Sequence, residues 1–187
     1  GFSRMTWHVE NLRKMFPDKP IFITEYGAGV DPRIHSNKPT RFDYSSEYGR
    51  MFHSAYIKMF KEMPYLLGTA VWNLNDFYSE WRIDAVPHVN NKGLVGLDRE
   101  KKNGYFLYQA YLSKKPYLMI GDRKWEIRGG KEGEKHNVEV FSNAENVTLS
   151  INGKSFGTQK VEDNLAVFEV VYFPGENYIA VKDSNGL

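Results

Sequence analysis

Apolar side chains recur in two different rhythms over the first 116 residues of the chain. In three segments every third or fourth residue is apolar, which is typical of amphipathic helices, and two short runs are continuously apolar and β-branched, which is typical of buried strands. The expected helices are 3–16, 45–63 and 105–113, and the expected strands are 21–24 and 67–72. This order predicts an α/β fold with parallel strands, joined by crossover helices and buried on both faces.

Beyond Pro116 the pattern changes to short runs in which apolar and polar residues alternate. Regularly spaced runs of this kind are typical of a β-sandwich, and Asn152-Gly153 between two of them is a strong hairpin signal. The expected strands are 125–128, 137–142, 147–151, 155–161, 165–172 and 178–182. The sequence therefore predicts two domains, an α/β part over 1–116 and an immunoglobulin-like β-sandwich over 117–187.

Composition removes several classes of function. The 187 residues carry a formal charge of only +2, which gives no reason to expect nucleic acid or an anionic membrane as a partner. No apolar run approaches the roughly 20 residues of a membrane span. The absence of cysteine does not decide the cellular compartment. A periplasmic or extracellular location is favoured over a cytoplasmic one. Because the chain begins at Gly1 inside an expected helix, we expect a portion of a longer polypeptide.

Glu25 is the first candidate for chemistry. It stands at the C-terminal end of the apolar run 21–24, where a buried charge would be costly unless it is paired or used. In a (β/α) barrel the C-terminal ends of the strands carry the catalytic groups, which makes this carboxylate a catalytic candidate. The alternative is a glutamate that ends a strand in solvent or in a structural ion pair.

Four motifs follow one another in this part of the chain: KPIFITEYGAG, SSEYGRMFHSAY, GTAVWNLNDF and PHVNNKGLVGLDREKK. Together they resemble glycoside hydrolase family 2, which contains β-galactosidases, β-glucuronidases and β-mannosidases. The resemblance covers roughly residues 3–116 and implies the C-terminal portion of a (β/α)8 TIM barrel, with 21–24 and 67–72 as its seventh and eighth strands. The sandwich beyond it resembles the domain that follows the barrel in many members.

The resemblance also implies roles for individual residues. Glu25 matches the catalytic nucleophile, and Trp72 matches an aromatic wall for the sugar, although it could be a simple core aromatic. Asn90 and Lys92 resemble the pair that holds the substrate carboxylate in β-glucuronidases, but similar Asn-x-Lys-Gly strings occur in galactosidase-like members, so this motif does not decide the sugar. Lys92 could equally be a solvated loop residue. The acid/base carboxyl belongs to the fourth barrel strand, outside this chain. The implied partners are a carbohydrate substrate and the rest of the same polypeptide.

The function that follows is a retaining exo-β-glycosidase, with a β-galactosidase as the leading hypothesis. A β-glucuronidase is the first alternative, and a non-catalytic carbohydrate-binding or cell-surface module is the second. Ala28 stands where large β-galactosidases carry a histidine, which puts a galactose contact there in doubt. Arg33 and His35 could line the pocket or be exposed. No cofactor is expected, and the histidines and acidic residues show no spacing typical of a metal site.

Two geometric expectations complete the prediction. Glu25 and Trp72 should lie at the C-terminal ends of adjacent parallel strands, because barrel topology makes those ends neighbours. Related barrels often have a non-proline cis peptide bond directly after this tryptophan, so the resemblance implies one between Trp72 and Asn73. Such bonds occur in well under about 0.1 % of cases, so chance would not explain one.

Overall fold

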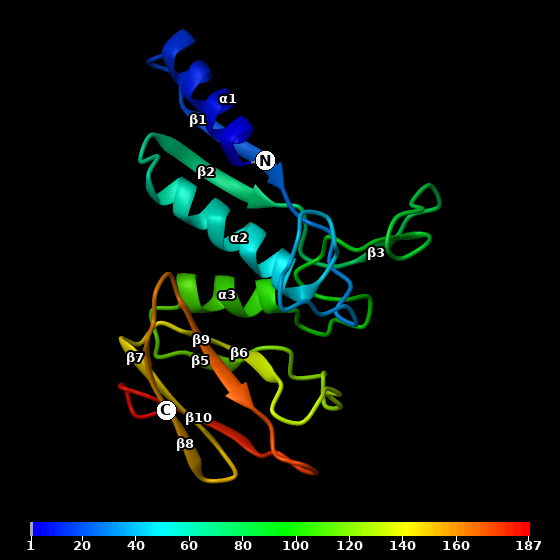
Figure 1. The fold of residues 1–187 in the computed structure, drawn as a ribbon. Coiled ribbons are helices and arrows are strands. Elements are labelled where there is room, and N and C mark those ends of the chain that lie inside the picture. The colour runs from blue at the N-terminus through cyan, green and yellow to red at the C-terminus, as the bar shows by residue number, and fades with distance from the viewer. Residues whose placement is uncertain (1) are drawn as a thin grey trace.

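The first part of the chain is a mixed α/β unit built on two parallel strands (Figure 1). The structure is a computed structural model that describes residues 2–187, with side chains from Arg4 onward. The elements of this part are α1 (Phe2–Met15), β1 (Ile21–Tyr26), α2 (Ser46–Lys61), β2 (Leu66–Val71), β3 (Phe77–Tyr78), β4 (Val89–Asn90) and α3 (Asn103–Leu112). All three expected helices and both expected strands are present, within a few residues of their predicted ends.

The parallel pairing of β1 and β2 is confirmed, with Ile21 opposite Leu66 and Tyr26 opposite Val71. Helix α2 connects the two strands, and its N-cap is Ser45, whose hydroxyl accepts a hydrogen bond from the backbone N–H of Tyr48. Helices α1 and α2 pack on one face of the strand pair. The buried residues of this core are Val9, Ile23, Tyr26, Tyr56, Met59 and Met63.

The other face of the strand pair is open, which corrects the expectation that both strands are buried on two sides. Phe22 on β1 is 50 % exposed and Leu67 on β2 is 72 % exposed. Successive side chains of a strand point to opposite faces, so these apolar residues lie opposite the helix-covered core. No element among residues 2–187 covers them, and the sequence pattern alone could not reveal this.

The second part of the chain is all-β, as predicted. Its strands are β5 (Leu118–Ile120), β6 (Lys135–Ser142), β7 (Asn146–Ile151), β8 (Lys154–Lys160), β9 (Leu165–Val171) and β10 (Ile179–Asp183). They form two antiparallel sheets with the orders β5-β6-β9 and β10-β7-β8. Both sheets contribute to one core, whose buried residues are Val138, Val140, Val147, Leu149, Ile151, Ala166, Phe168 and Val170.

Some local predictions for this unit are confirmed and others are wrong. The Asn152-Gly153 hairpin is confirmed, since both residues have positive φ, at 52° and 78°, between β7 and β8. The predicted strand 125–128 is wrong, because Trp125 leaves the sheet and stacks on the ring of His35. Strand β5 was not predicted, and it is only three residues long.

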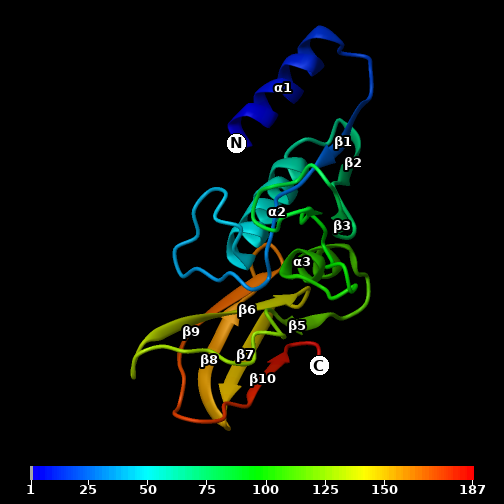
Figure 2. The same ribbon diagram turned by 90° about the vertical axis from the view of Figure 1, so that its right-hand side faces the viewer.

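Helix α3 joins the two parts, and it lies directly above β6 (Figure 2). Leu107 and Ala110 of α3 pack with Phe141 of β6 in one buried cluster. Beside them the guanidinium of Arg50 on α2 donates to Glu139 on β6, with an ion-pair distance of 2.6 Å. Burial raises the pKa of Glu139 to about 7, against the opposing effect of Arg50. The joint is therefore both apolar and charged.

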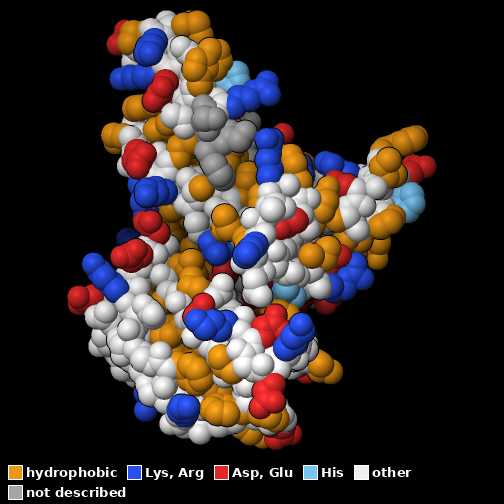
Figure 3. Space-filling view, viewed as in Figure 1, with side chains coloured by type: hydrophobic (Ala, Val, Ile, Leu, Met, Phe, Trp, Pro, Cys, Tyr) orange, Lys and Arg blue, Asp and Glu red, His pale blue; other side chains and the backbone are white. Residues whose placement is uncertain are grey.

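A loop arm between β3 and β4 projects away from the rest of the molecule (Figure 3). The large apolar side chains of this arm are almost fully in solvent, with Trp81 and Ile83 exposed at 85 % and 86 %, and Tyr78 at the end of β3 is exposed at 79 %. Among the described residues, no helix is both long and apolar enough to cross a membrane.

Candidate active site

The candidate site lies where β1 and β2 end. Glu25 is the fifth of the six residues of β1, which runs to Tyr26 and so extends beyond the predicted end at residue 24. Its side chain is exposed, while Tyr26 beside it is buried in the core. No hydrogen bond or ion pair joins the Glu25 carboxylate to another side chain that the structure describes. The carboxylate is thus available to a ligand from solvent.

Trp72 follows β2 directly and lies next to the end of β1. Its backbone N–H donates to the carbonyl of Tyr26 over 2.8 Å, so the C-terminal ends of the two parallel strands are adjacent, as predicted. The side chain is 40 % exposed and meets Phe77 edge to face, with ring centroids 6.2 Å apart. The peptide bond between Trp72 and Asn73 is cis, which confirms that prediction.

Gly27 allows this close approach of the two strand ends. A methyl group at its Cα would overlap the carbonyl oxygen of Trp72, which belongs to the backbone and has no side-chain freedom to yield. Glycine is the residue that permits backbone to pass so near to backbone. The sequence signal for this position was only a glycine that ends a strand.

The segment with Asn90 and Lys92 is held against the same edge. The backbone N–H of Asn73 donates to the carbonyl of Lys92 over 3.2 Å, which ties this loop to the residue after Trp72. Asn90 is only 5 % exposed, and its side-chain oxygen accepts a hydrogen bond from the backbone N–H of Lys92. Lys92 itself is half-buried. The structure therefore brings all four predicted residues to one end of β1 and β2.

A buried ion pair beneath this edge was missed by the sequence reasoning. The ammonium of Lys102 donates to both carboxylate oxygens of Asp76, at 2.9 and 2.8 Å, and also to the carbonyls of Val30 and Asn91. Asp76 in turn accepts from the backbone N–H of Gly93 over 2.8 Å. The pair thus fastens together the loops after β1, β2 and β4 at the start of α3.

Burial acts on both members of this pair. It raises the pKa of Asp76 and lowers the pKa of Lys102, and in each case the partner's opposite charge works against the shift. The side chains of Asp76 and Lys102 are 9 % and 4 % exposed, so water could hardly solvate either charge if the other were removed. A buried pair that is fully hydrogen-bonded is tolerated, whereas one lone charge would not be. The sequence shows that Asp76 lies in the NLNDF motif and that Lys102 directly precedes α3, but it does not show that the two side chains are in contact.

A second buried polar chain supports β1 from behind. The hydroxyls of Tyr26 and Tyr108 lie 2.8 Å apart, and Tyr108 also contacts Nδ1 of His53 at 3.2 Å. Burial alone lowers the pKa of His53 to about 4, because water is excluded from the imidazolium form. Tyr26 is the neighbour of Glu25 in the strand, so this chain of hydrogen bonds fixes the strand end that carries the carboxylate.

The loop residues Arg33 and His35 differ from each other in their surroundings. Arg33 is 78 % exposed and forms an ion pair with Asp31, so it lies in solvent rather than in a pocket. His35 is 9 % exposed and lies at the joint between the two parts, with its ring stacked on Trp125 at 3.7 Å. Neither reading proposed from the sequence, pocket lining or exposure, describes His35.

Comparison with known proteins gives consistent relatives for both parts. Residues 133–186 match a family model described as a domain of unknown function (DUF4982). The chain is 28 % identical to a β-glucuronidase of Bacteroides fragilis over 183 residues, covering 92 % of this chain and 26 % of that protein. It is 24 % identical to the β-galactosidase BoGH2A of Bacteroides ovatus over 209 residues, covering 98 % of this chain and 24 % of that protein.

Solved structures agree with the sequence comparison. Bacteroides uniformis β-glucuronidase 2, covalently bound to cyclophellitol-6-carboxylate aziridine, superposes with a TM-score of 0.88 at 33 % identity, covering 97 % of this chain and 24 % of that one. The chain thus spans about a quarter of the length of these relatives. The resemblance seen in the four motifs is confirmed, and the chain corresponds to a portion of the β-glucuronidases and β-galactosidases of glycoside hydrolase family 2.

Proposed function

We propose that this chain is part of a retaining exo-β-glucuronidase in which Glu25 is the nucleophile. The observation that carries the proposal is the convergence of Glu25, Trp72 and the Asn90–Lys92 loop at one edge of β1 and β2. Support comes also from the relatives, most of which carry the name β-glucuronidase. The β-galactosidase favoured by the sequence is the second candidate, because BoGH2A carries that name.

The fold that accompanies this proposal is the C-terminal part of a (β/α)8 barrel over residues 1–116, followed by an immunoglobulin-like domain over 117–187. The parallel strands β1 and β2, covered by helices on one face only, fit a barrel wall whose inner face and remaining strands come from elsewhere in the polypeptide. In such a barrel the exposed Phe22 and Leu67 face the interior. The open face described above then has a covering partner.

The proposed reaction has two steps. The ionised Glu25 carboxylate attacks the anomeric carbon while the bond to the leaving oxygen breaks, and a carboxyl group from another part of the polypeptide protonates that oxygen. The same group then takes a proton from water, which attacks the glycosyl–Glu25 ester and frees the carboxylate. Retaining enzymes place the two carboxyl groups about 5–5.5 Å apart. Trp72 provides an apolar wall for the sugar ring.

Glucuronide recognition is assigned to the loop of β4. The Lys92 ammonium would pair with the substrate carboxylate, and the Asn90 amide nitrogen would donate beside it, while the Asn90 oxygen holds the turn. Ala28, at the place of the histidine in large β-galactosidases, offers no polar contact for a galactose hydroxyl. These two features favour a glucuronide over a galactoside.

The test of the nucleophile uses covalent labelling. The full-length protein that contains this chain, treated with cyclophellitol-6-carboxylate aziridine, should gain one label on the peptide that carries Glu25, and Glu25→Gln should gain none and lose turnover. The amide is nearly isosteric, so the melting temperature should stay unchanged. A label on another residue, or a Glu25→Gln variant with near wild-type turnover, would contradict the assignment.

The test of the sugar uses aryl β-glucuronide and aryl β-galactoside. Lys92→Met should lower kcat/KM for the glucuronide by about 10- to 150-fold, since a charged hydrogen bond contributes roughly 1.5–3 kcal/mol. It should leave the galactoside rate within about twofold, and the remote Lys160→Met on β8 is the matched control. A higher wild-type rate on the galactoside would favour the second candidate, and no turnover on either would favour a non-catalytic carbohydrate-binding module.

A further inference from the structure

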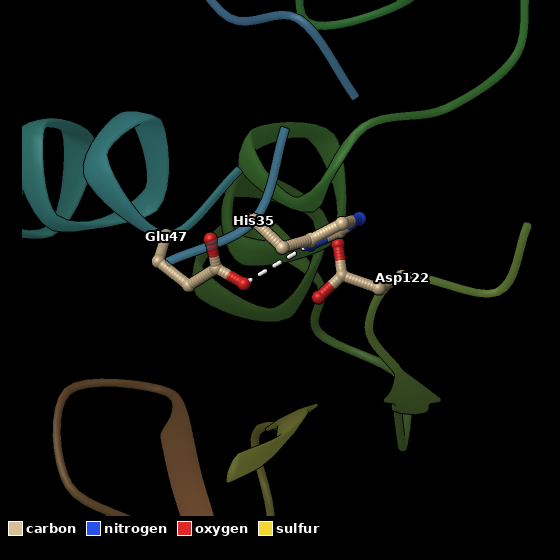
Figure 4. Close-up of side chains that lie close together, drawn as sticks. All are labelled: His35, Glu47 and Asp122. Carbon is tan, nitrogen blue, oxygen red and sulfur yellow. Dashed lines mark hydrogen bonds and ion pairs between the residues drawn. The ribbon is translucent and has the colours of Figure 1, made fainter. Parts of the chain in front are cut away.

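Three ionisable side chains meet at the joint between the two parts of the molecule, away from the candidate active site. They are His35 in the loop after β1, Glu47 in the first turn of α2, and Asp122 just after β5 (Figure 4). One nitrogen or carboxylate oxygen of each lies within 4.8 Å of those of the other two. Sequence spacing did not predict this set, because its members are far apart along the chain.

The surrounding contacts fix two of these side chains in place. Nδ1 of His35 lies 3.1 Å from one oxygen of Glu47, and the other oxygen of Glu47 accepts from the backbone N–H of Ser36 over 2.9 Å. The His35 ring is stacked on Trp125 with only 4° between the planes. The side chains of His35 and Glu47 are thus held by packing and hydrogen bonds, which is how metal ligands are oriented in proteins.

The polar contacts of the protein leave His35 incompletely satisfied. Its side chain is 9 % exposed, and Nε2 is buried without a hydrogen-bond partner among the described residues. If Nδ1 carries the proton for Glu47, Nε2 is a buried lone pair, and in the imidazolium form Nε2 is a buried donor without an acceptor. In every protonation state Nε2 of His35 therefore lacks a hydrogen-bond partner among the described residues.

The negative charge of the two carboxylates in the cluster is not balanced by an ion pair with lysine or arginine among the described residues. Glu47 and Asp122 bring these two carboxylates close together. Burial, together with the nearby Glu47, raises the pKa of Asp122. One imidazole and two carboxylates form a donor set that suits first-row divalent ions, with coordination positions left for water.

We propose that His35, Glu47 and Asp122 form a binding site for a first-row divalent transition-metal ion. The ion would be bound by a nitrogen lone pair of His35 and by the two carboxylates, whose charge it would neutralise, and it would tie three segments together. These segments are the loop that follows Glu25, the start of α2, and the end of β5 in the all-β unit. The site is structural, and it is independent of the sugar that the enzyme takes.

Zn²⁺ is the probe for this site. After removal of metal with a chelator, the full-length protein should bind Zn²⁺ in isothermal titration calorimetry, and the single variants His35→Gln, Glu47→Gln and Asp122→Asn should each lose one equivalent or weaken that site at least 10-fold. His136→Gln, Glu169→Gln and Asp163→Asn, which alter the same residue types outside the cluster, should bind as the wild type does. Equal stoichiometry and affinity in wild type and cluster variants would overturn the proposal.

A second measurement needs no variant, in case a substitution prevents folding. Co²⁺ added to the metal-free wild-type protein should give a saturable visible absorption spectrum that Zn²⁺ abolishes, and one equivalent of Zn²⁺ should raise the melting temperature. The absence of a saturable Co²⁺ spectrum would identify the cluster as a metal-free hydrogen-bonded joint and would refute the site.

Discussion

The two parts of the molecule solve the burial of apolar residues in opposite ways. The all-β unit closes its own core, since Val140, Leu149 and Ile151 are 0 % exposed between two facing sheets. The α/β unit buries only one face of its strands, and Leu67 on the other face is 72 % exposed. Monomeric proteins seldom leave strand-borne apolar residues uncovered in this way unless a partner covers them.

The all-β unit and the α/β unit differ in whether their own residues cover both faces and edges of their strands. The two sheets of the all-β unit close their core within the same 71 residues, whereas β1 and β2 have no neighbour on their free edges or open face among the described residues. The buried ion pair of the α/β unit, in contrast, is fully hydrogen-bonded within the chain, because Lys102, Asp76 and their carbonyl partners are all within hydrogen-bond reach. The contacts of this ion pair are therefore all local, while one face of the strands beside it has no cover among the described residues.

The largest expected effect concerns the buried ion pair of the α/β unit. Lys102→Met leaves the Asp76 carboxylate buried without a counter-charge, and we expect a loss of about 3–5 kcal/mol in stability, together with lost activity. Hydrogen exchange of the full-length protein should report faster opening of the loops after β1, β2 and β4. The neighbouring, exposed Lys101→Met is the control.

The double variant Asp76→Asn with Lys102→Met sharpens this result. It removes the lone charge and should recover part of the lost stability. If Lys102→Met alone opens these loops no faster than Lys101→Met does, the ion pair does not hold the site together.

The second prediction compares leucines from the two parts. Leu149→Ala in the closed β core should cost about 2–5 kcal/mol. Leu67→Ala, although exposed here, should cost a similar amount in the full-length protein if a barrel interior covers it. Leu112→Ala, 69 % exposed at the end of α3, is the control. Chemical unfolding gives the measurement, and a change at Leu67 within about 0.5 kcal/mol would show that this face stays in solvent.

The third and smallest effect is a pH dependence from His53. Its pKa is lowered from 6.5 to about 4, so between these values the unfolded chain binds more protons than the folded one. The stabilisation from neutral His53 is thus complete above pH 6.5 and is lost as the pH falls toward 4, by about 2–3 kcal/mol. The fall in melting temperature from pH 7 to 4.5 should be smaller in His53→Gln. The exposed His88→Gln should behave as the wild type, and a fall of wild-type size in His53→Gln would exclude this origin.

Much of the fold could be predicted because it depends on near neighbours in the sequence. The apolar runs gave β1 and β2, and the Asn152-Gly153 pair gave the β7–β8 hairpin through its positive φ angles. Four motifs carried the candidate residues Glu25 and Trp72, and the strand ends lie together as parallel topology requires.

The remaining features depend on contacts between distant residues. Lys102 reads as a loop lysine until Asp76 is seen beside it, and Trp125 reads as a strand residue until His35 is seen beneath its ring. The exposure of Phe22 depends on which elements cover the sheet, and no local pattern contains that information. Sequence thus predicts what a segment does alone, and misses what a partner far along the chain does to it.

The close approach at Gly27 has a consequence for engineering a protein that contains this chain. Any side chain at that position would push the backbone of Trp72, and with it the spacing between the two strand ends. A mutant library aimed at new substrates should therefore begin its randomised loop at Ala28 and leave position 27 unchanged. Variants recovered with a substitution at 27 should carry a compensating change in the segment after β2, and sequencing of the selected clones would reveal it.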